Sequence, residues 1–241
     1  MKIAFIGRGR VATHMSKAFA GAGHDVIMCG GRERTCQIPN DTDVVIISVK
    51  DDAISGVASE LRDCKALVLH TSGSISMDSI CSSRRGVLYP LQTFSLDRDV
   101  DFRKVPLFLE SSSHDDMMLL QILASDISDH FYPLDGSKRC TLHLAAVFCC
   151  NFVNHMMVLA NDVVERSNIP FHTLFPLIEE TISKIHDMTP IEAQTGPAVR
   201  WDEKVMNSHM DMLENSTQKE IYCLLSESIR KTHIDNNKKT E

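Results

Sequence analysis

The sequence predicts an α/β fold in which an N-terminal doubly wound parallel sheet is followed by an all-helical C-terminal domain. In the first half, short runs rich in Val, Ile and Leu alternate with helical patterns, which is typical of buried parallel strands joined by helices. From about Ser137 onward the strand-like runs stop. The 241 residues, 43% of them hydrophobic, are enough for two modest domains with a sizeable core.

Several short apolar runs are expected to form the sheet, because nearly continuous apolar runs are typical of strands buried on both faces. Between the first two runs, Val11, Met15 and Phe19 share one face at helical spacing, so a helix is expected there. The expected strands are residues 2–6, 25–28, 44–49, 66–70, 86–89 and 106–110.

The second half is expected to be helical. Residues 141–167 form one long candidate that is apolar around much of its circumference, which favours a central position or a dimer interface. Residues 171–186 follow, and Pro170 is well placed to start that helix. Residues 205–213 and 219–231 complete the helical part.

The predicted domain boundary lies near the segment FYPLDGSK, residues 131–138. The first domain is therefore expected to span residues 1–135 and the helical domain residues 136–232. Residues 233–241 are polar and are expected to form a flexible tail.

Charge and cysteine content restrict the class of protein. The net charge of −7 argues against non-specific binding to nucleic acid or to an anionic membrane, because either needs a basic surface. No apolar stretch is expected to be long enough to cross a bilayer.

The eight cysteines show neither a CxxC pair nor Cys/His ligand spacing, so no metal site is expected and a reduced, cytoplasmic protein is the simplest interpretation. Cys29, Cys149, Cys150 and Cys223 lie in apolar runs and are expected to behave as small buried hydrophobes.

The segment AFIGRGRVATHM predicts a dinucleotide site. Gly7 allows a tight turn after the first strand, Gly9 lets the backbone approach a pyrophosphate, and Ala12 lets the helix pack closely on the strand. The helix amino terminus then faces the anion. The alternative is a plain strand-to-helix turn that binds no ligand. The expected cofactor contacts in this loop are Gly7, Arg8, Gly9, Arg10 and Val11.

The second strand favours NADP over NAD. NAD enzymes usually carry an acidic residue at the end of this strand to bind the ribose 2′-hydroxyl. Here Cys29 is followed by two glycines and then by Arg32 and Arg34, while Asp25 lies at the other end of the strand. An arginine can pair with a 2′-phosphate, and Arg32 is the first candidate. The alternative is that both arginines are solvated loop charges.

Two further strand ends are expected to border the cofactor, because ligands of open α/β sheets lie beyond the carboxyl ends of strands. Asp51 or Asp52 is more simply interpreted as a helix cap than as a catalytic residue. A Ser–His pair in the segment LHTSGSIS has no GxSxG nucleophile elbow, so hydrolase chemistry is not favoured. The expected contacts are Ser48, Val49 and Lys50 after one strand, and His70, Thr71 and Ser72 after the next.

Candidate catalytic residues lie in the helical half. His143 and Asn151 are eight residues apart and share one face of a mostly apolar helix. In the polar segment TGPAVRWDEKVMNSH, Arg200 could hold an anionic group and His209 could exchange a proton. The structural alternatives are a hydrogen-bonded core pair and an interhelical loop with Asp202 as its N-cap.

Together, IGRGRVA, SVKDDAI, HTSGS, YPLQTFS, the His143–Asn151 helix and TGPAVRWD resemble a family of Rossmann-like oxidoreductases with a C-terminal helical domain of unknown function. That family is similar to the deazaflavin-dependent NADP oxidoreductases and, more distantly, to pyrroline-5-carboxylate reductase and 6-phosphogluconate dehydrogenase. The resemblance spans residues 2–229 and implies a dimer formed by the helical domain, with the active site between domains. Relatives usually carry Pro in place of Lys50 and Gly in place of Trp201.

The expected function is reversible hydride transfer between NADP and a small carbonyl, imine or alcohol substrate. The candidate proton donors are His143 and His209, with Lys50 and His70 as alternatives, while Asn151 and Thr195 would orient the substrate. A non-catalytic NADP(H) sensor is the alternative, and it would need no proton donor.

Overall fold

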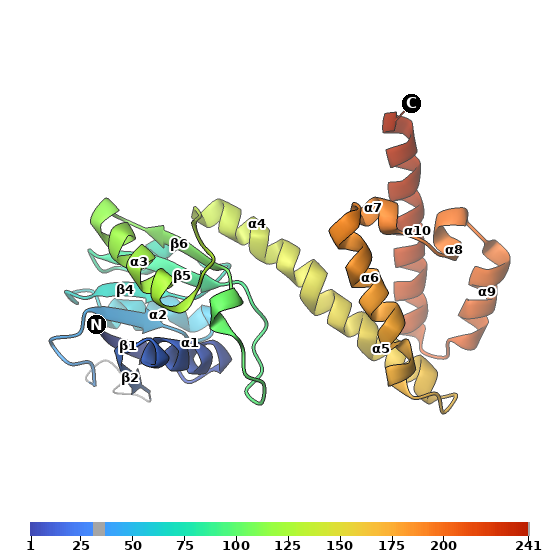
Figure 1. The fold of residues 1–241 in the computed structure, drawn as a ribbon. Coiled ribbons are helices and arrows are strands. Elements are labelled where there is room, and N and C mark those ends of the chain that lie inside the picture. The colour runs from blue at the N-terminus through green and yellow to red at the C-terminus, as the bar shows by residue number, and fades with distance from the viewer. Residues whose placement is uncertain (31–36, 241) are drawn as a thin grey trace. The chain divides into compact units, whose positions relative to one another are not determined.

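The computed structural model describes residues 1–30 and 37–240, which form two compact units, Met1–Asn151 and Phe152–Glu241 (Figure 1). The sequence placed the boundary earlier, after residue 135. The difference arises because the first part of the long helix packs on the first unit. Arg139 of that helix is buried, where it forms an ion pair with Glu110 and donates a hydrogen bond to the carbonyl oxygen of Ile75.

In its described residues the first unit contains a seven-stranded sheet with the order β2-β1-β3-β4-β5-β6-β7. The strand pairs are parallel apart from β5 and β6, which are antiparallel. The predicted strands are all present, and β7 is an additional short strand. The bounds are β1 Lys2–Ile6, β2 Asp25–Cys29, β3 Val44–Ile47, β4 Leu67–His70, β5 Arg85–Pro90, β6 Leu107–Ser111 and β7 Phe131–Pro133.

Helices cover both faces of this sheet, which is why its strands are continuously apolar. Alternate residues of β1 belong to different cores: Phe5 packs with helices α1 (Arg10–Gly21) and α3 (His114–Ile127), whereas Ile6 packs with α2 (Ile54–Glu60). The sheet is therefore doubly wound, as the sequence predicted.

Helix α3 is an element that the sequence pattern did not predict, because its apolar residues include the consecutive run MMLL rather than one narrow stripe. A capping signal was present, because the Ser113 hydroxyl oxygen accepts a hydrogen bond from the backbone N–H of Asp116.

The predicted long helix is present as α4 (Gly136–Ala146), a π-helical turn (Val147–Phe152) and α5 (Val153–Glu165). Residues expected to form a flexible tail are helical up to Thr240, since neither Gly nor Pro interrupts the last helix. The other helices of the second unit are α6 Phe175–Asp187, α7 Pro190–Ala193, α8 Pro197–Arg200, α9 Glu203–Met212 and α10 Ser216–Thr240.

By length and composition alone, the helical stretch Gly136–Glu165 could cross a membrane. Its most apolar window has a mean hydropathy of 1.6. This differs from the expectation that no apolar stretch reaches that length. Length and composition do not distinguish a membrane-spanning helix from an apolar helix that another protein surface covers. The cysteines also differ from expectation, because Cys29 is buried whereas Cys149 and Cys223 are exposed.

Candidate functional site

The glycine-rich turn after β1 has two glycines with different physical roles. Gly7 has φ +126°, and a Cβ there would lie 2.1 Å from the carbonyl oxygen of Ser48, so only glycine fits. Gly9 is the N-cap of α1 and has no side-chain cap; apart from its chain neighbours, no atom of the described residues lies within 4 Å of a Cβ placed there. The amino terminus of α1 therefore has no side-chain cap, and Gly9 leaves room beside it, which is an arrangement that can bind a phosphate.

A cavity of about 560 Å³ lies in front of this turn, at the carboxyl ends of β1, β3, β4 and β5. Most of the predicted cofactor contacts line it together: the loop residues Gly7 to Val11, then Ser48, Val49 and Lys50, and finally Thr71 and Ser72. Parallel strands bring these separate loops to one edge of the sheet, which explains why the sequence pattern located them. Asp51, Gly73, Tyr89, Pro90, Gln92 and His143 also line the cavity.

His70 differs from its expected role as a cofactor contact. Its side chain is fully buried, so it lies beneath the wall of the cavity rather than on it. Its Nδ1 accepts a hydrogen bond from the backbone N–H of Ser72 at 3.2 Å, which shapes the loop after β4. Burial, and then the nearby Arg139 cation, lower the pKa of His70 to about 4. The ring is therefore neutral at pH 7 and acts as a structural hydrogen-bond acceptor.

Arg32 and Arg34 lie outside the described residues, but another arginine occupies the end of β2. A Cβ on Gly30 would lie 2.8 Å from Nε and 3.1 Å from Cζ of Arg8, so the guanidinium rests against this glycine. Gly30 directly follows β2, where NAD enzymes carry their acidic residue. A cation therefore lies where the carboxylate would otherwise be. The sequence placed Arg8 in the cofactor loop without locating it at this point.

Tyr89 of β5 and His143 of α4 meet at the cavity. The Tyr89 hydroxyl and His143 Nδ1 are 3.0 Å apart, and the two rings are in edge-to-face contact. Tyr89 is only 7% exposed, and its burial raises the pKa of the hydroxyl, partly offset by the Arg139 cation. His143 was a predicted site residue, whereas Tyr89 was not, because its sequence position marks it only as the end of a strand before the segment PLQTFS.

A second cavity, of about 520 Å³, shares Arg10, Val11, Tyr89, Gln92 and His143 with the first. His143 and Asn151 both line it, as their spacing of eight residues predicts for one face of a helix. The rest of its lining is mostly apolar and comes from the loop after β5, from α4 and from the π-helical turn that follows α4. These residues are Leu91, Thr93, Phe94, Leu142, Ala145, Ala146, Cys149 and Cys150.

The remaining predicted catalytic residues, Arg200 and His209, belong to the second unit. Both are exposed in that unit. His209 Nδ1 is 2.9 Å from the hydroxyl of Tyr222 on α10. Asp202 is the N-cap of α9, since its carboxylate accepts a hydrogen bond from the backbone N–H of Val205. Trp201 has φ +52°, a left-handed conformation in which the glycine expected of relatives would be less strained.

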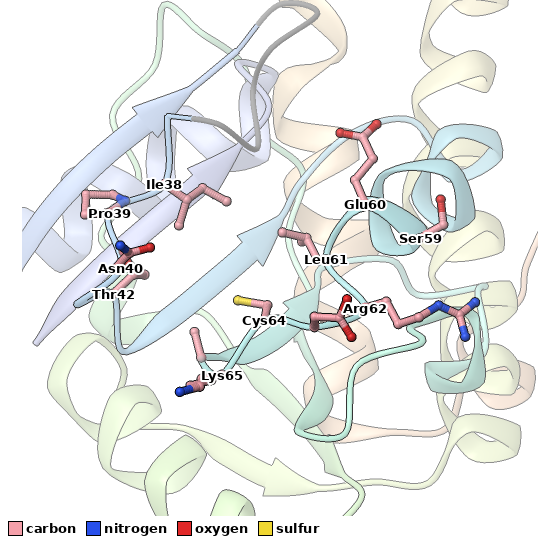
Figure 2. A pocket seen from close by; sticks show the side chains of 12 residues that line it. Ile38, Pro39, Asn40, Thr42, Ser59, Glu60, Leu61, Arg62, Cys64 and Lys65 are labelled. Atoms are coloured by element: carbon pink, nitrogen blue, oxygen red, sulfur yellow. The ribbon is translucent and has the colours of Figure 1, made fainter.

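A third cavity, of about 650 Å³, lies at the opposite edge of the sheet, where β3 and β4 begin (Figure 2). Figure 2 shows its lining side chains, which come from the segment before β3 and from the end of α2 and the loop that leads to β4. None of them is a predicted cofactor contact. Its charged residues, Glu60, Arg62, Asp63 and Lys65, are exposed and of mixed sign. Binding sites of open α/β sheets lie at the carboxyl ends of the strands, so the glycine-turn cavity is the candidate site.

Comparison with known proteins supports this assignment of the fold. A family model described as a domain of unknown function (DUF2520) matches residues 105–229, more than half of the chain. The solved structure of a "putative NADP oxidoreductase" from Bacteroides fragilis is 37% identical, with 95% of this chain and 98% of that one covered and a TM-score of 0.87. Comparison with curated protein sequences gives no match.

More distant structures share the fold. An imine reductase from Streptomyces aurantiacus is 13% identical, with 92% of each chain covered and a TM-score of 0.65. A pyrroline carboxylate reductase from Plasmodium falciparum, solved with NADP bound, is 11% identical, with 95% of this chain and all of that one covered and a TM-score of 0.60. The predicted resemblance to Rossmann-like oxidoreductases with a helical C-terminal domain is thus confirmed.

Proposed function

Because this chain belongs to the DUF2520 family, and a 37% identical member of its fold is described as a putative NADP oxidoreductase, we propose that it is an NADP-dependent oxidoreductase. Its substrate is a small carbonyl, imine or alcohol. Bound NADPH would supply the hydride, so the protein has to orient both partners and exchange one proton.

One observation carries this proposal: the cavity in front of the glycine turn joins the elements that a dinucleotide needs. Gly9 leaves space for the pyrophosphate at the uncapped amino terminus of α1. Ser48, Thr71 and Ser72 supply polar groups around the same cavity, toward the nicotinamide end. A plain strand-to-helix turn would not need an open space at Gly9 or a cavity beyond it.

The preference for NADP rests on Arg8. Its guanidinium lies against Gly30 at the end of β2, and no carboxylate among the described residues pairs with it. A guanidinium in this place can form bidentate hydrogen bonds with a 2′-phosphate. Arg32, the first candidate from the sequence, stays a predicted contact of the same phosphate.

The second cavity is proposed to hold the substrate. Its shared residues Tyr89 and His143 border the cofactor cavity, and its mostly apolar lining suits a small organic molecule. His143 is the proposed proton donor and Asn151 orients the substrate. Arg200 and His209 stay predicted contacts, with Arg200 binding an anionic group.

We also propose that the protein works as a cytoplasmic homodimer formed by its helical part. The second unit exposes many large apolar side chains on α5 and α6, more than isolated surface residues would explain. They include Val158, Val163, Leu177, Ile182 and Ile185.

Calorimetric titration with NADPH and NADH tests the cofactor proposal. NADPH should bind at least about ten-fold more tightly than NADH, and Arg8→Ala should remove about ten-fold of that affinity while changing NADH binding little. Arg62→Ala is the matched control, since Arg62 is an exposed arginine beside the other cavity. If neither nucleotide binds, the glycine turn is only a turn and the proposal fails.

Turnover then separates an enzyme from a non-catalytic NADP(H) sensor. Mixing the protein and NADPH with cyclic imines, aldehydes and 2-oxo acids should give protein-dependent loss of NADPH absorbance with one of these classes. A sensor would bind NADPH and consume none. The hydrogen-bonded Tyr89–His143 pair between the two cavities favours the enzyme, because a sensor needs no proton donor there.

A further inference from the structure

We infer that Tyr89 is a positioning residue that makes Nε2 of His143 the proton-exchanging atom, and that Gly73 provides the space in which this pair forms. The inference rests on the proposed function, because it concerns the proton that accompanies hydride transfer. Tyr89 and Gly73 thereby join His143, the proton donor expected from the sequence.

Tyr89 and His143 lie where the proposed cofactor and substrate cavities meet. A proton donor has to reach the oxygen or nitrogen atom next to the carbon that receives the hydride, so it must lie where cofactor and substrate meet. The two cavities share Arg10, Val11, Gln92, Tyr89 and His143. The first three cannot donate a proton at neutral pH, because a guanidinium stays charged and the others have no titratable group.

Chemistry then distinguishes the two remaining residues. The buried Tyr89 hydroxyl has a raised pKa, which keeps it protonated and makes it a poor acid. A histidine gains and loses a proton readily near neutral pH. Tyr89 is therefore the fixed partner and His143 the residue that exchanges the proton.

The geometry selects the atom. Because Tyr89 lies 3.0 Å from Nδ1, its oxygen can accept a hydrogen bond from Nδ1–H, while in the described part of the chain no group bonds to Nε2. The imidazolium gives its Nε2 proton to the substrate oxygen or nitrogen as that atom's electron pair is freed by hydride addition at carbon. The neutral ring keeps its proton on Nδ1, which donates a hydrogen bond to the Tyr89 oxygen. A proton from solvent later restores the imidazolium at Nε2. Charge and protons balance over the cycle.

Gly73 explains how the pair fits. A Cβ at this position would lie 2.7 Å from His143 Nδ1 and 2.8 Å from Tyr89 Cζ, both closer than van der Waals contact. The conformation of Gly73 is not itself left-handed, so the glycine is needed for the close approach of these rings. Any side chain here would push the histidine away from the tyrosine.

A tyrosine could instead serve only to fix α4 on the sheet, so the test must report on the proton. We would record ¹⁵N chemical shifts of His143 in histidine-labelled protein, with and without saturating NADP⁺, in the wild type and in Tyr89→Phe. The wild-type neutral ring should carry its proton on Nδ1, and NADP⁺ should move the Nε2 resonance more than the Nδ1 resonance. In Tyr89→Phe the tautomer should shift toward Nε2–H, because the acceptor for Nδ1–H is lost.

Tyr132→Phe is the matched control, since Tyr132 is an exposed tyrosine on β7, and it should leave the His143 resonances unchanged. Gly73→Ala is the second variant and should reproduce the tautomer shift of Tyr89→Phe. The inference would be overturned if the neutral wild-type ring carried its proton on Nε2. It would also be overturned if the His143 resonances did not change while calorimetry showed NADP⁺ bound. Either result would leave the proposed function standing. Absence of NADP⁺ binding would overturn both.

With a substrate identified by the turnover assay, Tyr89→Phe should lower kcat by about 10- to 100-fold and leave the KM for NADPH unchanged within about two-fold. His143→Gln should cost at least as much. A Tyr89→Phe enzyme with wild-type kcat would contradict the positioning role.

Discussion

Arg139 of α4 forms an ion pair with Glu110 of β6, although the Arg139 side chain is only 1% exposed. The same guanidinium donates a hydrogen bond to the carbonyl oxygen of Ile75. Three segments that are far apart in sequence are thereby joined at one buried cation. Because His143 lies one turn further along α4, this cation also holds the proposed proton donor against the sheet.

Replacing Arg139 by Met should lower the free energy of unfolding by about 3 kcal/mol, because it leaves the partly buried Glu110 carboxylate without its cation. Urea unfolding measures the loss. Arg103→Met is the control, since the Arg103–Asp129 pair is exposed and its removal should cost less than about 1 kcal/mol. Equal losses in the two variants would show that the buried Arg139–Glu110 pair stabilises the fold no more than an exposed ion pair does.

His70 should make stability fall in mild acid. Its pKa is about 4 in the folded protein against 6.5 for the ordinary side chain, so below pH 6.5 the unfolded chain binds a proton that the folded chain does not. The free energy of unfolding should therefore drop by about 3 kcal/mol between pH 7 and pH 4 from this residue. His70→Asn keeps an acceptor for the Ser72 N–H and should flatten that part of the stability profile.

His114→Gln is the control for this measurement, because His114 is an exposed histidine at the start of α3. Its stability profile should match that of the wild type. If His70→Asn shows the same acid dependence as the wild type, His70 is not the group responsible.

Gly9→Ala should separate folding from binding. Among the residues that the structure describes, none beyond the chain neighbours lies within 4 Å of the added methyl group, and Gly9 has φ −76°, so stability should change by less than about 0.5 kcal/mol. The methyl group would occupy the space expected for the pyrophosphate, so NADPH affinity should fall at least about ten-fold. Gly7→Ala, by contrast, should destabilise the fold itself, because its Cβ would overlap the Ser48 carbonyl. Unaltered NADPH affinity in Gly9→Ala would place the phosphates elsewhere.

Gly30→Asp should change the choice of nucleotide. A carboxylate beside Arg8 would neutralise the cation and repel a 2′-phosphate, so the ratio of NADPH to NADH affinity should fall at least about ten-fold. Gly30→Ala adds the same Cβ without the charge, and it displaces only the flexible end of Arg8. A ratio that falls equally in both variants would mean that space, not charge, determines the preference.

Leu177→Glu tests the proposed dimer. Leu177 is 66% exposed on α6, and a charge there should prevent apolar association, which light scattering would report as a halved molar mass. Leu96 is similarly exposed in the first unit, so Leu96→Glu should leave the mass unchanged. A wild-type protein that is monomeric at all concentrations would rule out the dimer.

Local features of this protein follow from its sequence alone. Strands such as β1 and β3 were predictable because burial on both faces demands continuous apolar residues, and the glycine turn was predictable because its chemistry is local. The loops lining the cofactor cavity followed from a rule about strand ends. His143 and Asn151 reach the same cavity because helical spacing alone places them on one face.

Features that depend on residues distant in sequence emerge only from packing in the folded protein. The reversed direction of β6, the burial of His70, the position of Arg8 against Gly30 and the meeting of Tyr89 with His143 all arise from packing between segments. A local pattern records which side chains share a face, but it carries no information about what packs against that face. For that reason the candidate role of Tyr89 is visible only in the folded protein, where His143 of α4 lies beside its hydroxyl.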